Sequence, residues 1–89
     1  MFVHLGGNCL IKTADIIGIF SAKEYSKDFF KNLRNRFNNF CEIEDLSEGN
    51  NIDSIVLTEK KIYLSVISSS TLQKRINQNI VYNNGGNND

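Results

Sequence analysis

Proline and tryptophan are absent from this 89-residue sequence, and its acidic and basic residues balance at 10 each. No collagen-like repeat is present, and no apolar run approaches the ~20 residues that a membrane-spanning helix needs. The balanced charge gives the whole molecule no net attraction to nucleic acid or to a membrane. The N-terminus lacks a charged segment followed by an apolar one, so we expect a cytoplasmic protein without a membrane partner. The remaining composition, 40% apolar and 22% charged, is that of one small folded domain.

Histidine and cysteine are too scarce for the common catalytic and metal sites. His4 is the only histidine, and Cys9 and Cys41 have no CxxC spacing. We therefore expect two free, buried or half-buried thiols that are neither catalytic nor bridged, and no metal or cofactor. A nucleophilic serine would need a base within reach, and only His4 is available. The chain is thus expected to be no enzyme and to have no small-molecule substrate.

The first twenty residues have the pattern of three strands. The segment MFVHL meets GGN and is followed by CLIK, which predicts a hairpin with Gly6, Gly7 and Asn8 in its turn. The segment DIIGIF, residues 15–20, predicts a buried strand in which Gly18 marks a bulge or a close backbone approach. A glycine pair can also cradle phosphate, but such a loop precedes a helix, whereas another strand follows here.

Residues 26–37 predict an amphipathic helix that Ser26 can cap, with Asp28 in its first turn. An apolar stripe follows one side: Phe29, Phe30, Leu33 and Phe37. Basic residues recur on another face: Lys27, Lys31 and Arg34. That face is either the solvated side of a surface helix or a patch for nucleic acid. Residues 41–53 carry only acidic charges, which could neutralise this patch if the two segments meet.

The segment FCEIED predicts a short strand, and LSEGNN a loop whose Gly49, Asn50 and Asn51 suit left-handed turn positions. The segment SIVLTEKKIYLSVI predicts a second hairpin, with strands Ser54–Leu57 and Ile62–Ile67 and a turn over Thr58–Lys61. These elements place another pair of antiparallel strands in the second half of the chain.

A run of serines, residues 68–70, predicts the start of a second helix. Ser70 as N-cap with Gln73 three residues later fits a capping box, and Leu72 and Ile76 supply an apolar edge. The Asn/Gly-rich residues 79–89 lack a core pattern and are expected to form a flexible tail. The predicted fold is α/β of the α+β type, a single domain over residues 1–78. It would have five or six short strands in hairpins and two helices. We expect it to be oligomeric, because a small core gains from burying a face against a copy of itself.

Three stretches resemble a known family: HLGG near the start, DIIGIF, and IYLS running into SSSTLQKR. Over residues 1 to about 78 the chain resembles the small bacterial extracellular matrix regulatory proteins of the RemA/RemB type, and most the RemB branch. The resemblance implies a compact α/β subunit and, as in the RemA branch, a ring-like homo-oligomer. It also implies binding to double-stranded DNA that activates biofilm-matrix genes.

The sequence departs from the DNA-binding RemA branch at positions where that branch carries arginine. Asp15 aligns with the arginine before the third strand, and Asn50 and Asn51 with those before the central hairpin. Arginine neutralises phosphate, whereas asparagine only hydrogen-bonds it and aspartate repels it. The candidate nucleic-acid contacts are therefore Lys12, Arg34, Arg36, Asn50, Asn51, Lys60 and Lys61. Two functions stay open: an oligomeric DNA-binding or DNA-associated transcriptional regulator, and a non-DNA-binding protein that assembles with itself or a related subunit.

Overall fold

The computed structural model describes the backbone of residues 1–37 and 41–83, and the side chains of residues 1–36 and 41–78. The elements follow one another as β1 (Phe2–Gly6), β2 (Cys9–Lys12), a 3-10 turn (Thr13–Asp15), β3 (Ile16–Ser21), α1 (Lys27–Phe37), β4 (Glu42–Asp45), β5 (Ser54–Thr58), β6 (Lys61–Ser65) and α2 (Ser69–Asn83). The predicted class is confirmed: the described residues form a small single α+β domain with two helices and six strands in two sheets.

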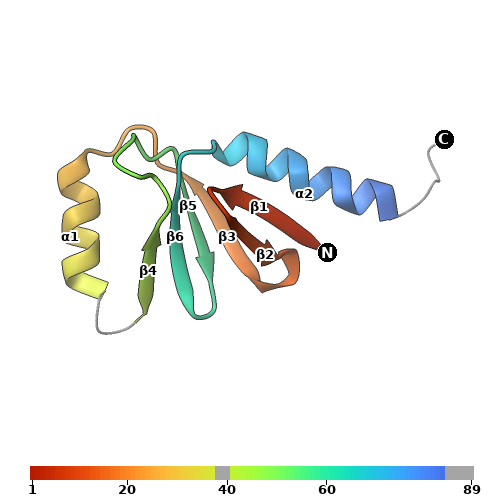
Figure 1. Cartoon of the computed structure of the whole chain (residues 1–89), viewed down its shortest axis with the longest axis horizontal. Helices are drawn as coiled ribbons and strands as arrows, with labels where there is room; N and C mark the ends of the chain where they lie inside the picture. Colours follow the sequence, from red (N-terminus) through yellow and green to blue (C-terminus); the bar gives the residue numbers. More distant parts are fainter. Residues whose placement is uncertain (38–40, 84–89) are drawn as a thin grey trace.

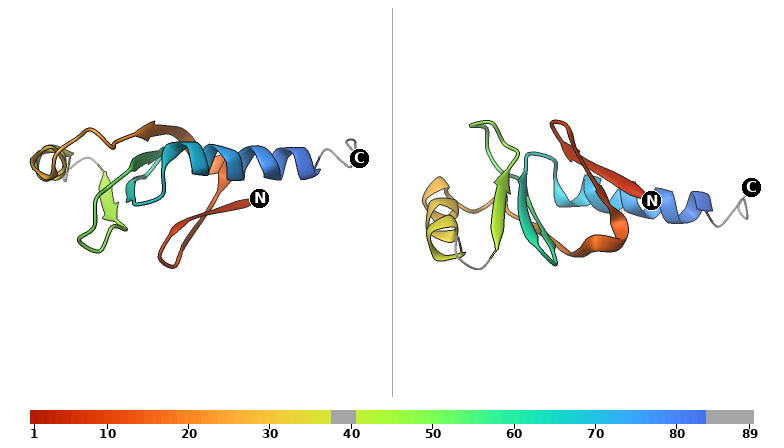
Figure 2. Two further views of the ribbon diagram at one scale, coloured as in Figure 1. Left: turned by 90° about the horizontal axis from the view of Figure 1, so that it is seen from above. Right: turned by 60° about the horizontal axis from the view of Figure 1, so that its bottom comes forward.

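The strands form a two-stranded hairpin, β1–β2, and a four-stranded sheet in the order β3-β5-β6-β4 (Figure 1). Both predicted hairpins are confirmed, because β1 pairs with β2 and β5 with β6 in antiparallel fashion. Strand β4 joins the far edge of the sheet parallel to β6. Figure 2 shows the β1–β2 hairpin standing out from the four-stranded sheet as a separate ribbon.

The turn of the first hairpin depends on glycine as predicted, since Gly6 and Gly7 have φ of +112° and +55°. In β3 the register with β5 shifts between Ile16 and Gly18, which confirms the predicted bulge. The ring of Phe20 also lies over Gly18, 2.9 Å from where a Cβ atom would stand. The contact at Gly18 is therefore with a side chain of the same strand and is not the close approach of another backbone. The prediction that this strand is buried is wrong, because β3 lies at an edge of the sheet and Ile17 and Phe20 are exposed.

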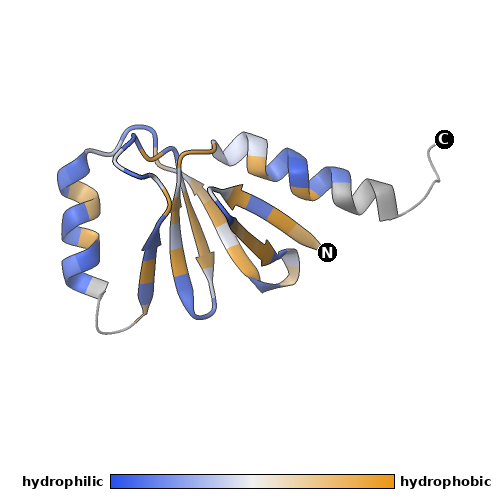
Figure 3. Cartoon of the chain, viewed as in Figure 1, coloured by the Kyte–Doolittle hydropathy of each residue, from blue (hydrophilic) through white to orange (hydrophobic). Residues whose placement is uncertain are grey.

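Successive residues of β5 and β6 face opposite sides of the sheet, so these two central strands contribute to two cores. One core joins the sheet to the β1–β2 hairpin and α2: Val3, Leu5, Val56, Tyr63 and Leu72. The other joins it to α1: Ala22, Phe30, Ile62 and Leu64. Figure 3 shows the apolar residues of α1 turned toward the sheet and its hydrophilic residues turned away. The predicted apolar stripe is borne out in part: Phe30 is buried and Leu33 half-buried, whereas Phe29 is 38% exposed.

Two buried serines fasten the hairpin and the start of α2 to the sheet. Ser54 and Ser65 lie opposite each other on β5 and β6 and are fully buried. The Ser65 hydroxyl donates to the carbonyl of Leu5 at 2.7 Å, and the Ser54 hydroxyl donates to that of Ile67 at 2.7 Å. Both buried hydroxyls therefore have partners, as buried polar groups require.

Helix α1 starts as predicted, with the Phe29 amide donating to the Ser26 hydroxyl at 3.2 Å. The predicted cap of α2 is wrong, because the Thr71 amide donates to the hydroxyl of Ser68 and not to that of Ser70. The reason lies in β6, which ends at Ser65, two residues before the predicted end. The Ser65 hydroxyl accepts the amide of Ile67 at 3.0 Å and turns the chain there, so the helix begins earlier.

Helix α2 continues to Asn83 and so enters the range that was predicted to be a tail from residue 79. Residues 79–83 contain neither glycine nor proline, and the first glycine after them is Gly85. Residues 84–89, the side chain of Phe37, and Phe40 of the predicted strand FCEIED lie outside the described residues. In the described part of the chain, neither helix is long and apolar enough to cross a membrane.

Candidate functional site

A groove of about 630 Å³ lies between α1 and the loop that joins β4 to β5. Four cationic side chains line its helix side: Lys23, Lys27, Lys31 and Arg34. The loop side contributes Asn50 and Asn51, together with Asp45 and Asp53. Two segments that are separate in the sequence therefore meet here, one basic and one acidic and polar.

The three lysines of this groove follow one another at intervals of four residues, and Lys27 and Lys31 lie on α1 itself. Residues four apart on a helix are neighbours on one face, about 6 Å apart along the axis. Among the described residues none of the three forms an ion pair. Their charges are therefore available to an anion that enters the groove. We call this set, Lys23, Lys27 and Lys31, the lysine row.

Arg34 differs from the lysine row because it pairs with Asp45. The same carboxylate accepts the Ser47 amide at 2.8 Å and the Ser47 hydroxyl at 2.5 Å. Partial burial by itself raises the pKa of Asp45, but the hydrogen bonds from Ser47 and the charge of Arg34 outweigh it, so the pKa lies below its ordinary value. Arg34 thus ties the loop to α1, and the acidic segment partly neutralises the basic helix face, as the charge pattern suggested.

The loop beyond Asp45 is a tight turn closed on Ser47. The amide and the side-chain Nδ2 of Asn50 both donate to the Ser47 carbonyl, at 3.0 and 3.1 Å. The left-handed positions of the described loop are Glu48 and Gly49, with φ of +52° and +86°. The prediction was therefore right for Gly49 and wrong for Asn50 and Asn51. Asn50 is held in the turn, whereas Asn51 is exposed and makes no side-chain hydrogen bond within the described residues.

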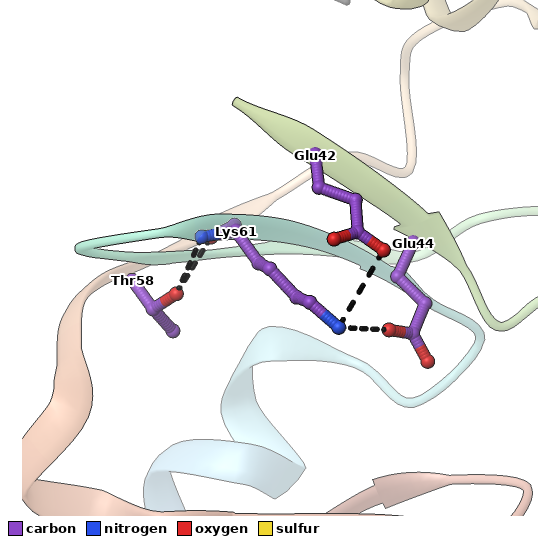
Figure 4. Close-up of polar contacts among 4 residues, drawn as sticks. All are labelled: Glu42, Glu44, Thr58 and Lys61. Carbon is purple, nitrogen blue, oxygen red and sulfur yellow. Dashed lines mark hydrogen bonds and ion pairs between the residues drawn. The ribbon is translucent and has the colours of Figure 1, made fainter. Parts of the chain in front are cut away.

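Lys61 lies elsewhere, where β6 begins beside β4 (Figure 4). Its Nζ lies 2.9 Å from an oxygen of Glu44 and 3.6 Å from one of Glu42. The hydrogen bond with Glu44 raises the pKa of Lys61, and the two negative charges add to this effect. The Thr58 hydroxyl donates to the Lys61 carbonyl at 2.7 Å and accepts its amide at 3.0 Å, which closes the β5–β6 turn. Lys61 therefore joins strands, and its charge is already matched.

The other predicted contacts do not lie at the groove. Lys60 and Asp15 line a second hollow beside the β5–β6 turn, and Lys12 directly precedes the 3-10 turn that contains Asp15. Asp15 adjoins Ile16, which pairs with Thr58, while Asn51 lies before Ser54, which pairs with Ser21. The two positions are thus at opposite ends of β3, roughly 15–17 Å apart at the rise of an extended strand.

The predicted set is therefore divided by the fold. Only Arg34, Asn50 and Asn51 meet at the groove, while the exposed Arg36 lines a separate hollow on α1. The lysine row was absent from the predicted set, although the spacing of Lys27 and Lys31 had marked a basic helix face. The missing information was which loop lies opposite that face.

Both cysteines are free and half-buried, as predicted. Burial is the main reason that the pKa of Cys9 is raised, and the negative charge of Glu44 adds to it. A thiol with a raised pKa stays protonated at neutral pH and is a poor nucleophile. Cys9 therefore serves as a packing residue against the hairpin core.

The family match with known proteins extends over both hairpins and the groove. The family described as RemA-like, extracellular matrix regulatory protein A-like, matches residues 2–76. Extracellular matrix regulatory protein B of Bacillus subtilis (strain 168) is 35% identical over 79 residues, which cover 84% of this chain and 89% of that protein. The chain thus belongs to the RemA-like family of extracellular matrix regulatory proteins.

Proposed function

We propose that the protein is a cytoplasmic transcriptional regulator of biofilm-matrix genes that acts as an oligomer on double-stranded DNA. It has no enzymatic activity in this proposal, and the α1 groove is its DNA-facing surface. The observation that carries the proposal is the lysine row in a member of a matrix regulator family. These three cations form no ion pair within the described part of the chain and lie beside Asn50 and Asn51.

Electrostatics support a contact with the phosphate backbone at this surface. Lysine neutralises phosphate as a point charge and releases counterions, which supplies affinity independent of sequence. The exposed amide of Asn51 can donate a hydrogen bond to a phosphate oxygen but adds no charge. Arg34 offsets Asp45, whereas Asp53 opposes an anion at the groove. Each subunit is therefore expected to contribute a weak contact, and assembly is needed to multiply it.

The proposed oligomer rests on the exposed edge of the sheet. Strand β3 is an edge strand whose sequence IIGIFS contains no charge and no proline. Ile17 and Phe20 are 64% and 53% exposed, and such an apolar, unprotected edge invites pairing with another chain. We propose that a second copy covers this edge.

A second candidate function is a non-DNA-binding assembly protein that pairs with itself or with a related subunit. The same β3 edge favours it, as does the balanced net charge. Asp15, Asn50 and Asn51 favour it as well, because the resemblance to the RemA branch implies arginine at these three positions. The two candidates share the assembly and differ only in whether the groove takes DNA.

The deciding experiment is electrophoretic retardation of duplex DNA by the full chain over a series of salt concentrations. The double variant Lys27→Ala/Lys31→Ala should weaken binding and reduce the slope of log affinity against log salt by about 0.9 for each phosphate that is no longer neutralised. Lys61→Ala is the matched control and should leave the slope unchanged, because that charge is paired with Glu42 and Glu44. Wild-type protein that assembles but retards no DNA at low salt would exclude the regulator and favour the assembly protein.

A further inference from the structure

Tyr25 is the part of the groove that a contact with duplex DNA does not use. It is 50% exposed and lines the groove. Its ring stacks on that of Phe29, with centroids 4.4 Å apart and planes at 21°, and meets the edge of Phe30 at 6.4 Å. These contacts hold the ring in one orientation beside the lysine row. Duplex DNA keeps its bases stacked inside the helix and offers no ring face to such a platform.

We propose that the α1 groove binds a small purine nucleotide, with its phosphate on the lysine row and its base against Tyr25. The volume of about 630 Å³ is within the range of small-molecule sites, roughly 300–1,000 Å³. The half-buried Ile52 and the ring of Phe30 supply apolar lining, as such sites usually have. The groove therefore combines a cationic part, a flat aromatic part and a polar edge.

The polar edge favours a base that donates hydrogen bonds. One Nδ2 hydrogen of Asn50 is donated to the Ser47 carbonyl, which orients the side chain. Its oxygen accepts no hydrogen bond among the described residues and is available to a ligand. Asp53 lines the same side of the groove and is an acceptor when ionised. Adenine and cytosine offer an amino group alone, whereas guanine offers its N1–H and N2 amino donors side by side, as two adjacent acceptors require. We therefore expect guanosine 5′-monophosphate to be the best of the simple probes.

Binding at this site would also control the function proposed above. The phosphate of the nucleotide would occupy the same lysines as the DNA backbone, so the two ligands would compete. This regulatory consequence rests on the proposed DNA binding, whereas nucleotide binding itself does not.

The test is a titration of the full chain with guanosine 5′-monophosphate, in which heteronuclear NMR and calorimetry measure binding. Tyr25→Leu should weaken nucleotide binding by roughly tenfold, the lower part of what base stacking contributes, and Tyr25→Phe should retain it. The DNA retardation of Tyr25→Leu should stay within about twofold of wild type. Lys27→Ala/Lys31→Ala should weaken the binding of both the nucleotide and duplex DNA. Lys60→Ala, at the other end of the sheet, should weaken the binding of neither.

Two further probes measure the contributions of the base and of the phosphate separately. Guanosine tests binding of the base without the phosphate, and inorganic phosphate tests binding of the anion without a base. Equal affinity for inorganic phosphate and the nucleotide, or an unchanged affinity in a folded Tyr25→Leu variant, would overturn the inference and leave a general anion surface. Binding of single-stranded oligonucleotides without binding of the mononucleotide would overturn it as well. Nucleotide binding without duplex retardation would instead refute the proposed function and leave this inference intact.

Discussion

Asp45 shows how one side chain holds the candidate site together. Its carboxylate accepts hydrogen bonds from the amide and hydroxyl of Ser47 and pairs with Arg34, so it joins α1 to the loop that carries Asn50 and Asn51. The folded pKa of Asp45 is lower than its ordinary value of 3.8. Its contribution to stability is therefore complete above about pH 4 and is lost as pH falls through the folded pKa.

Replacing Asp45 with asparagine removes the charge but keeps the size of the side chain. We expect Asp45→Asn to lower the free energy of unfolding at neutral pH by about 1 kcal/mol, after allowance for solvent screening. The loss of stability below about pH 4 should also be shallower than in wild type. Urea denaturation at a series of pH values measures both effects, with Asp15→Asn as control. An acid dependence identical to that of wild type would contradict the role given to Asp45.

We expect different effects on the loop and on DNA binding when each of its two asparagines is replaced with arginine. Asn51→Arg adds a charge at an exposed position with no hydrogen bond to lose, so it should strengthen DNA binding and steepen the salt dependence by about 0.9 for each phosphate engaged. Asn50→Arg would also remove the bond from Nδ2 to the Ser47 carbonyl. Retardation assays on Asn51→Arg, alone and with Asp53→Asn, test the groove as a DNA surface. Unchanged DNA binding in a folded, assembled variant would mean that this loop does not face DNA.

At the scale of the secondary-structure element, the start of α2 distinguishes three neighbouring serines. Only Ser68 accepts the Thr71 amide, while Ser70 contacts the hydroxyl of Ser68. Ser68→Ala should therefore lower the free energy of unfolding by about 1 kcal/mol, the usual effect of removing an N-cap, whereas Ser70→Ala should have little effect. Chemical denaturation monitored by circular dichroism compares the two. Equal destabilisation by both variants would mean that the cap is shared.

The β1–β2 hairpin depends on the backbone of Gly6. Its φ of +112° is unfavourable for any residue with a Cβ atom, while the nearest side-chain atom, on Ile67, would be at an ordinary 3.6 Å. The cost of Gly6→Ala should therefore come from backbone strain, about 1–3 kcal/mol in the free energy of unfolding. Gly7→Asn, at φ of +55°, should cost less because asparagine tolerates left-handed conformations. Chemical denaturation measures the free energy of unfolding of both variants. An unchanged value for Gly6→Ala would show that the turn can adopt another conformation.

At the scale of the whole molecule, the exposed β3 edge predicts that assembly can be disrupted by one charge. Phe20→Lys places a cation in an apolar edge strand, and we expect it to convert an oligomer to a monomer without unfolding the chain, since Phe20 is 53% exposed. Leu10→Lys, on the hairpin at 58% exposure, is the matched control for the reduced surface hydrophobicity. Size exclusion with light scattering measures the mass. An unchanged oligomer in Phe20→Lys, or a monomeric wild type, would exclude assembly through β3.

Sequence alone was sufficient for the features that depend on neighbours a few residues apart. The glycine turn at residues 6–8, the cap at Ser26 and the apolar side of α1 each follow from local conformational preferences or from a helical period. The second hairpin was likewise predicted, since its turn and strands are contiguous in the sequence. Family membership was also predictable, because the motifs that carry it are short and contiguous in the chain.

Tertiary structure decided which charges remain free, because the partners lie far apart in the sequence. Parallel pairing of β4 with β6 places Glu42 and Glu44 beside Lys61, and the contact of β4 with α1 brings Asp45 to Arg34. The sequence analysis named Arg34 and Lys61 as candidate contacts and left out the lysine row, because the partners of each cation cannot be identified from sequence. The local capping-box pattern favoured Ser70 as the helix cap, but the cap is Ser68 because β6 ends at Ser65 and the helix starts earlier. A site built from ion pairs and hydrogen bonds between distant residues depends on tertiary packing, which cannot be predicted from a local sequence pattern.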